Sequence, residues 1–420
     1  MGMRDRESVS PALSAPAACS SCDTNVRSGG WRQRFPALPW NFLIWLWLIP
    51  ACGLIHEIWL GCRWNLRANA LRRIEAAAAG QRGGLSPVGL VESPRRWRRL
   101  VEPYVPLPQA ASRIGDPLGF VFNEVKCSAL YLYQGFTDAS LADVRWFPEV
   151  KELRVSEAEV TDRGLAALRG LRELRSVSLQ KLPIQGTGLA GLGDLERLEK
   201  LSLDGSRLTD QGLSCLPGLP ALEDLSLAEV PITGEGLVCL DQLPRLSNLV
   251  LRGTEVGDRG LLSLPGLPSL KSLDLSKTPL HGEGLAGLRQ LPQLKSLSLD
   301  QTALDDEGML GLPALPALTQ LSLRGTRVHG SGLAALERLP ALQTLFLDET
   351  PLEDSAVGHL PPLPQLRTLS LRKTSLSAAA LPGLITRFPG LQVLELPRTD
   401  SLTREVLDEL VEQTGWRVFH

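Results

Sequence analysis

The sequence predicts an α/β solenoid of about 11 to 12 repeats, each supplying one parallel strand and one short helix. An apolar–x–apolar motif recurs at a constant interval along most of the chain. Its first residue is Leu153, Val177, Leu201, Leu225, Leu249, Leu273, Leu297, Leu321, Leu345 and Leu369. Leu130 precedes this series and Leu394 follows it, each one position out of the regular interval. A unit of this size cannot bury its leucines alone, so the copies must stack into one continuous core.

The N-terminal part is predicted to hold a disordered segment, residues 1–38, and then a transmembrane or signal-anchor helix, residues 39–60. The first segment is rich in Ser, Ala, Pro and Arg and has no apolar period. The second contains an apolar run from Trp40 to Leu60 with only three clearly polar side chains. A spanning helix needs about 20 apolar residues, and this run is long enough. Because Pro50 and Glu57 interrupt the run, a buried or interfacial helix is the alternative.

The sequence leaves the processing and the orientation of this helix open. Residues 49–52, Ile-Pro-Ala-Cys, resemble a bacterial lipoprotein site at which Cys52 would be lipidated, although the apolar run continues past the cysteine. Three arginines precede the helix within residues 27–34, and four follow it within residues 63–73. The positive-inside rule therefore favours a cytoplasmic repeat array only slightly.

Residues 61–125 are predicted to form a juxtamembrane helix, RANALRRIEAAAAG, followed by a Pro-rich connector. The connector contains a basic run, RRWRR, from Arg95 to Arg99. This run could contact anionic lipid head groups, but a solvated charge cluster is the simpler interpretation.

The net charge of −2 conceals an asymmetry between the two parts of the chain. Residues 1–125 contain 15 arginines and 9 acidic residues, a net charge of +6, so the rest of the chain carries −8. An acidic repeat array argues against nucleic acid as a partner.

Residues 126–420 are predicted to be the repeat domain with its end caps. In the apolar–x–apolar motif alternate residues point to opposite faces of a strand, and the following GLxxLxxL segment suits a short helix or 3₁₀ turn. A recurring threonine is expected to bond the backbone where the chain leaves the strand. A recurring glycine is expected where backbones approach each other. The threonines are Thr254, Thr278, Thr302, Thr326, Thr350 and Thr374.

A double period, two repeats long, is superimposed on the basic repeat. Aspartates from Asp162 to Asp354 alternate with glycines from Gly186 to Gly330, so adjacent repeats should differ in their outer segments. At the two ends, Tyr131–Tyr133 is expected to help cap the first repeat, and residues 402–419 are predicted to close the array with a helix and a strand.

These motifs resemble the leucine-rich repeat family over residues 126–420. The TDxGL version is similar to bacterial repeats related to those of ribonuclease inhibitors and F-box adaptors, with Thr where many members have Asn or Cys. The resemblance implies a leucine-rich-repeat horseshoe that binds protein partners on its concave strand face. The whole layout also resembles membrane-anchored envelope proteins of planctomycete-type bacteria.

No catalytic or metal-binding motif accompanies the repeats. The sequence lacks G-x-S-x-G, a P-loop and H-E-x-x-H. Cys215 and Cys239 share a column of small residues and are expected to be buried free thiols. His281 and His329 are two repeats apart, roughly 10 Å, which is too far to share one ion. We therefore expect no metal, no cofactor, no small-molecule substrate and no enzymatic activity.

A protein-binding patch is predicted on the concave face at Arg324, Phe346, Asp348 and Arg372. Asp300 and the charged members of this patch alternate in sign on neighbouring strands, where they can form ion pairs. Phe346 could anchor a partner or could shield the core locally. The predicted function is a noncatalytic, membrane-tethered scaffold for a protein ligand in the bacterial cell envelope. A cytosolic regulator or adaptor without a membrane span is the alternative.

Overall fold

The computed structural model describes residues 69–70, 129–133 and 135–420. All of them lie in the second of two units of the chain, Leu60–His420. Outside the described residues lie the segments predicted for residues 1–38 and 39–60, together with nearly all of residues 61–125. The predicted lipidation site at Cys52 also lies outside them. In the part of the chain that the structure describes, no helix is both long and apolar enough to cross a membrane.

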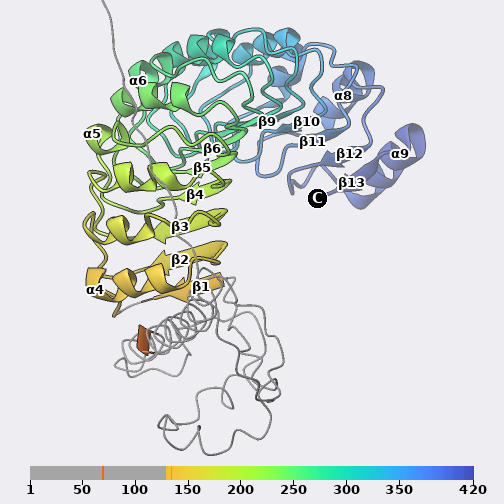
Figure 1. Ribbon diagram of the computed structural model, residues 1–420. Helices are drawn as coiled ribbons and strands as arrows, with labels where there is room; N and C mark the ends of the chain where they lie inside the picture. Colours follow the sequence, from red (N-terminus) through yellow and green to blue (C-terminus); the bar gives the residue numbers. More distant parts are fainter. Residues whose placement is uncertain (1–68, 71–128, 134) are drawn as a thin grey trace, which may run out of the picture. The chain divides into compact units, whose positions relative to one another are not determined.

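Within the described residues, thirteen parallel strands form one sheet whose order follows the sequence. Their bounds are β1 (Ala129–Leu132), β2 (Glu152–Ser156), β3 (Ser176–Gln180), β4 (Lys200–Ser202), β5 (Asp224–Ser226), β6 (Asn248–Val250), β7 (Ser272–Asp274), β8 (Ser296–Ser298), β9 (Gln320–Ser322), β10 (Thr344–Phe346), β11 (Thr368–Ser370), β12 (Val393–Glu395) and β13 (Arg417–Phe419). In the repeat array the strands line the inner side of an arc and the short helices its outer side (Figure 1). The predicted α/β solenoid is confirmed.

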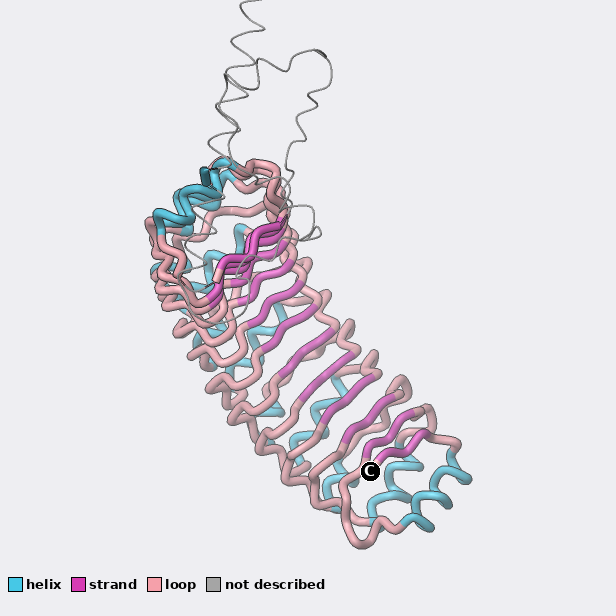
Figure 2. Tube along the Cα trace, turned by 90° about the horizontal axis from the view of Figure 1, so that it is seen from below, coloured by secondary structure: helices cyan, strands magenta, loops and turns pink. Residues whose placement is uncertain are grey.

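The predicted register of the strands is also confirmed. Leu345 lies opposite Leu369 in the next strand, and the same column pairs Leu130 with Leu153 and Leu369 with Leu394. The strands follow one another as regular rungs (Figure 2). The irregular intervals at Leu130 and Leu394 are therefore absorbed in the connections, and the strands stay in register.

The outer segments of the repeats are short helices of two kinds. The α-helices are α4 (Asp138–Leu141), α5 (Asp210–Leu213), α6 (Asp258–Leu262), α7 (Asp306–Leu310), α8 (Leu381–Arg387) and α9 (Arg404–Thr414). The 3₁₀ helices are η1 (Ala142–Trp146), η2 (Gly164–Leu168), η3 (Leu189–Asp194), η4 (Glu235–Gln242), η5 (Glu283–Gln290), η6 (Ser331–Arg338), η7 (Asp354–His359) and η8 (Ala378–Ala380). In the central repeats α5, α6 and α7 alternate with η4, η5 and η6, so the predicted difference between adjacent outer segments is confirmed.

One continuous hydrophobic core runs along the array between the strands and the outer helices. In a representative repeat, Leu297, Leu299 and Leu304 are at most 1% exposed. Full burial of one such side chain contributes about 1.5–3 kcal/mol. Each repeat buries these leucines against its neighbours, so the stability of the array comes from stacking.

The threonine and glycine columns have the predicted structural roles. The Thr302 hydroxyl donates to the Leu299 carbonyl at 2.8 Å, and the other five threonines bond the corresponding carbonyls. At Gly308, a Cβ atom would lie 1.8 Å from the carbonyl oxygen of His281 in the preceding repeat. Only glycine allows the two backbones to approach so closely.

The double period of Asp and Gly has a structural cause. The carboxylate of Asp258, the first residue of α6, accepts three backbone hydrogen bonds from the next repeat. The donors are the N–H groups of His281, Gly282 and Gly284, at 2.8 to 3.1 Å. Gly282 adopts a φ of 123°, a conformation that favours glycine. Asp162, Asp210 and Asp306 bind the next repeat in the same way, so each of these four aspartates holds the glycine turn of the repeat that follows it.

The closing helix and strand predicted for residues 402–419 are confirmed as α9 and β13. At the other end, Tyr131 is part of β1 and pairs with Arg154 of β2, so it belongs to the first repeat strand and not to a separate cap. Cys215 and Cys239 are free thiols as predicted, but they are half-buried and not fully buried.

Candidate functional site

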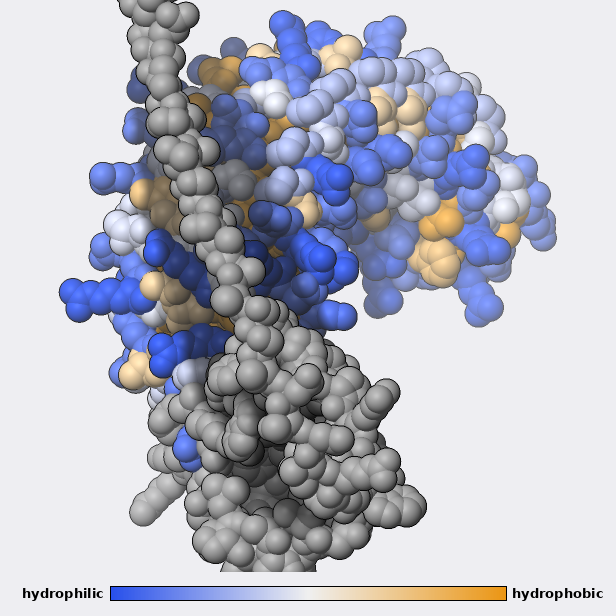
Figure 3. All heavy atoms as spheres, viewed as in Figure 1, coloured by the Kyte–Doolittle hydropathy of each residue, from blue (hydrophilic) through white to orange (hydrophobic). Residues whose placement is uncertain are grey.

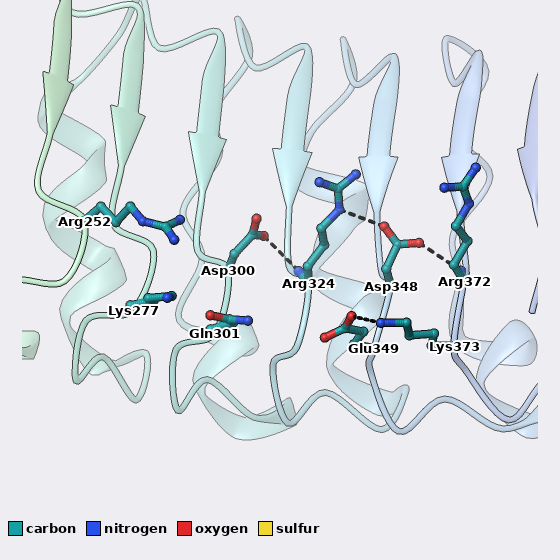
Figure 4. A pocket seen from close by; sticks show the side chains of 9 residues that line it. All are labelled: Arg252, Lys277, Asp300, Gln301, Arg324, Asp348, Glu349, Arg372 and Lys373. Carbon is teal, nitrogen blue, oxygen red and sulfur yellow. Dashed lines mark hydrogen bonds and ion pairs between the residues drawn. The ribbon is translucent and has the colours of Figure 1, made fainter. Parts of the chain in front are cut away.

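A hollow of about 470 Å³ lies at the C-terminal ends of the strands from β6 to β11 (Figure 4). The described residues that line it are Arg252, Lys277, Asp300, Gln301, Arg324, Asp348, Glu349, Arg372 and Lys373. These side chains come from six consecutive repeats, so the hollow extends along the array.

Two rows of residues supply the lining side chains. The first row is the second residue after each strand, and it includes Arg252, Arg324 and Arg372. The leucine before each of these residues is buried; Leu323, for example, is fully buried. Because side chains alternate along extended backbone, the first row faces away from the core. The second row is the residue that follows the first.

The second row has a left-handed backbone. The φ angles of Lys277, Gln301, Glu349 and Lys373 lie between 57° and 61°. Gly325 occupies the same row with a φ of 64°. A residue with a Cβ atom is less stable in this conformation by about 1–2 kcal/mol. The chain therefore keeps long polar side chains at positions where glycine would be less strained.

Asp348 is only 8% exposed, and neighbouring repeats supply its hydrogen-bond donors. Its Oδ1 atom accepts from the backbone N–H of Arg372 at 2.8 Å and from the hydroxyl of Ser370. Its Oδ2 atom accepts from Nε of Arg324 at 2.7 Å. Asp300 likewise accepts the backbone N–H of Arg324 at 2.9 Å. The predicted ladder of side-chain ion pairs is therefore only partly formed, because the aspartates bond the backbone of the next strand.

Arg324 is held in place by two contacts. Its guanidinium pairs with Asp348 and lies over the ring of Phe346, with Cζ 4.1 Å from the ring centroid. A cation over an aromatic face contributes about 0.5–1 kcal/mol at an exposed site. Phe346 is half-buried under this guanidinium. The Phe346 ring is therefore covered by an arginine, whereas an aromatic binding anchor would be freely exposed.

Positive charge is in excess at one end of the hollow. The lining contains five cationic and three anionic side chains. At the β11 end, Nε of Arg372 pairs with Glu395 at 3.1 Å, and Nζ of Lys373 pairs with Glu349 at 2.6 Å. Within residues 129–133 and 135–420, no ion pair reaches the exposed side chains at the β6 and β7 end. These two side chains are Arg252 and Lys277.

The four residues of the predicted patch lie together. Arg324, Asp348 and Arg372 line the hollow, and Phe346 lies beneath the Arg324 guanidinium. The second row was not predicted from the sequence. Glycine in three of its ten positions, such as Gly325, was the available signal, because glycine often marks a left-handed residue.

The lining favours the binding of charged and hydrogen-bonding groups. Among the described residues that form it, there is no histidine, cysteine or hydroxyl side chain. No group of three His, Cys, Asp or Glu side chains in the described part of the chain could hold a metal ion. His281 and His329 are exposed. Where it is not grey, the surface in Figure 3 is mostly hydrophilic, with hydrophobic side chains in small groups.

Comparison with known proteins agrees with this architecture. A family model described as "Leucine Rich repeat" matches residues 266–288, about the length of one repeat. No curated protein matches the chain in sequence. The parallel strand order, the constant register and the matched repeat define the fold as a leucine-rich-repeat solenoid. Folds of this class generally serve in protein–protein interaction and present extended concave surfaces.

Similar solved structures have low sequence identity. An internalin (inlF) from Listeria monocytogenes is 17% identical with a TM-score of 0.38, covering 60% of this chain and 82% of that one. A chain of the Rad7–Elc1 complex from yeast is 19% identical with a TM-score of 0.42, covering 65% and 78%. The APL1 leucine-rich repeat domain is 17% identical with a TM-score of 0.41, covering 60% and 63%.

Proposed function

We propose that this chain is a noncatalytic binding module that holds a protein ligand on its concave strand face. The observation that carries the proposal is the hollow across six repeats, lined by side chains from two adjacent rows. A surface built from many repeats suits a macromolecular ligand, because it offers contacts over a long distance. Ion pairs along it would set the specificity and the rate of association.

The centre of the proposed site consists of Arg324, Phe346, Asp348 and Arg372. Arg324 and Arg372 face the ligand, and the covered ring of Phe346 supports the Arg324 guanidinium. Asp348 positions the Arg324 guanidinium, because donors of the chain itself occupy both of its oxygens. Arginine and aromatic residues of this kind often dominate the binding energy of protein interfaces.

We also propose a membrane tether at residues 39–60, in a single-pass protein of the bacterial cell envelope whose repeats are of the TDxGL type. The apolar stretch from Trp40 to Leu60 supports this proposal. Residues 1–38 and 61–125 would then flank the tether, and residues 126–420 would form the binding domain.

Photocrosslinking from two positions on either side of the same core tests the binding face. A photoreactive amino acid replaces Ser298 on the concave face or Ala286 on the outer helix η5, both half-exposed. In cells that express the full chain, we expect a discrete protein adduct from Ser298 and none from Ala286. Adducts from Ala286 alone would place the ligand on the outer face and contradict the proposal.

Membrane fractionation tests the tether separately. We expect the full chain to stay with membranes after alkaline extraction, as an integral protein does. Protease access to the repeats in intact and permeabilised cells then gives their side. A freely soluble chain would contradict the tether and favour a cytosolic regulator with the same binding face.

A further inference from the structure

We infer that the ligand presents an extended acidic segment to the hollow, with its carboxylates at Arg252 and Lys277. The inference rests on the proposed function and adds the chemistry of the ligand. The end of the hollow near β6 and β7 has two exposed cations that no ion pair reaches within the described residues 129–133 and 135–420. A carboxylate placed between them would supply the missing partner of both.

The two ends of the hollow are not equivalent. Near β11, Arg372 and Lys373 already have carboxylate partners from their own chain, and the aspartates of the first row accept internal hydrogen bonds. A new anion gains less there, because an existing ion pair must first be opened. The unpaired cations at the β6 and β7 end therefore select where the acidic residues bind.

The dimensions of the hollow suit a short extended segment. It spans five steps between neighbouring strands, from the end of β6 to the end of β11. At about 4.8 Å per step this is roughly 24 Å, the length of about seven extended residues. The side chains along this path are polar, with Gln301 and Glu349 able to bond backbone or polar groups of the segment.

A protein segment fits these observations better than nucleic acid. The part of the chain after residue 125 carries a net charge of −8, which repels a long polyanion. A short acidic segment of a protein can contact the two cations, while the rest of that protein stays away from the acidic parts of the repeat array.

Fluorescence anisotropy of the full chain with labelled peptides tests the inference. The probe is a peptide of about eight residues in which Glu alternates with Ser, and its neutral analogue has Gln in place of Glu. We expect the acidic peptide to bind, the neutral analogue not to bind, and affinity to fall as salt is raised. The double variant Arg252→Gln/Lys277→Gln should lower affinity roughly tenfold.

Two further variants separate the local site from net charge and from stability. Arg259→Gln/Arg289→Gln removes the same charge from exposed positions on the outer helices, and its affinity should stay within about twofold of the wild type. Lys277→Gly removes one cation and relieves the left-handed strain. It should weaken peptide binding without lowering the melting temperature, so that loss of binding cannot be ascribed to unfolding.

Three results would overturn the inference. The first is that the acidic peptide does not bind the wild type. The second is that the outer-face variant loses as much affinity as Arg252→Gln/Lys277→Gln. The third is that an oligothymidine of about eight nucleotides binds more tightly than the acidic peptide. The photocrosslink from Ser298 keeps these failures distinct from a failure of the proposed function. An adduct from Ser298 without peptide binding would retain a concave protein ligand but exclude an acidic one.

Discussion

Asp348 is a buried carboxylate whose donors come from the strands on either side of it. Asp204, in the same column, accepts the Ser226 hydroxyl at 2.6 Å and the backbone N–H of Ala228 at 2.9 Å. Each aspartate thereby accepts a backbone N–H group that lies just beyond the end of the next strand and has no partner in the sheet. Asp348 differs by also fixing the guanidinium of Arg324, which links the structural contact to the proposed site.

Replacing Asp348 by Asn is expected to lower the free energy of unfolding by about 1–3 kcal/mol, because the amide group cannot accept at both of its polar atoms. Urea unfolding followed by circular dichroism measures this loss. Asp204→Asn is the matched control, since one oxygen of Asp204 accepts the same two kinds of donor from the next repeat, whereas its other oxygen accepts the Ser202 hydroxyl in place of an arginine. An equal or larger loss in the control would show that the Arg324 contact adds nothing to stability.

At the scale of the repeat element, the Asp-to-glycine contact couples the repeats of α5, α6 and α7 to the 3₁₀ repeats that follow them. The pKa values of Asp210, Asp258 and Asp306 are affected by burial, which raises them, and by backbone N–H donors, which lower them. The donors prevail, and each pKa is lowered in the folded chain. These carboxylates therefore stabilise the fold above the pKa of an unfolded aspartate, about 4.

That stabilisation should be lost as pH falls through the lowered pKa values. We expect the urea midpoint to decrease between about pH 5 and pH 2. Asp258→Asn should lower the midpoint at neutral pH and flatten its dependence on pH in this window. Glu307→Gln removes one exposed carboxylate from α7 and should leave the slope unchanged. A slope identical in the wild type and Asp258→Asn would contradict a stabilising role for this carboxylate.

Over the whole array, the strand number and register were predictable because every repeat carries the same buried leucines. The threonine and glycine columns were predictable for the same reason, since each residue type has one dominant role at its position. The left-handed row was not predictable in this way. Lys277 and Gln301 are residues that any exposed loop could contain, and their φ angles depend on how the chain leaves the strand.

The pairing of charges also depended on the three-dimensional arrangement. Alternating signs at Asp300, Arg324, Asp348 and Arg372 predicted a ladder of ion pairs along the strands. In the structure the aspartates bond backbone N–H groups of the next repeat, so Asp300 and Asp348 contribute to stability as well as to charge. That these residues share one face of the strands was therefore predictable, and the division of the carboxylate contacts between backbone and side-chain donors was not. Their role in binding a ligand stays a prediction.

Amine-reactive labelling of lysines most directly tests whether the concave face is occupied by a ligand. The reagent is applied to the full chain in cell lysate and, separately, to the purified chain. We expect Lys277 and Lys373, in the hollow, to be labelled several-fold more slowly in the lysate than after purification. Lys271 and Lys295, exposed before the strands β7 and β8, should be labelled equally in both. Equal labelling of Lys277 in the two samples would contradict a ligand bound on the concave face.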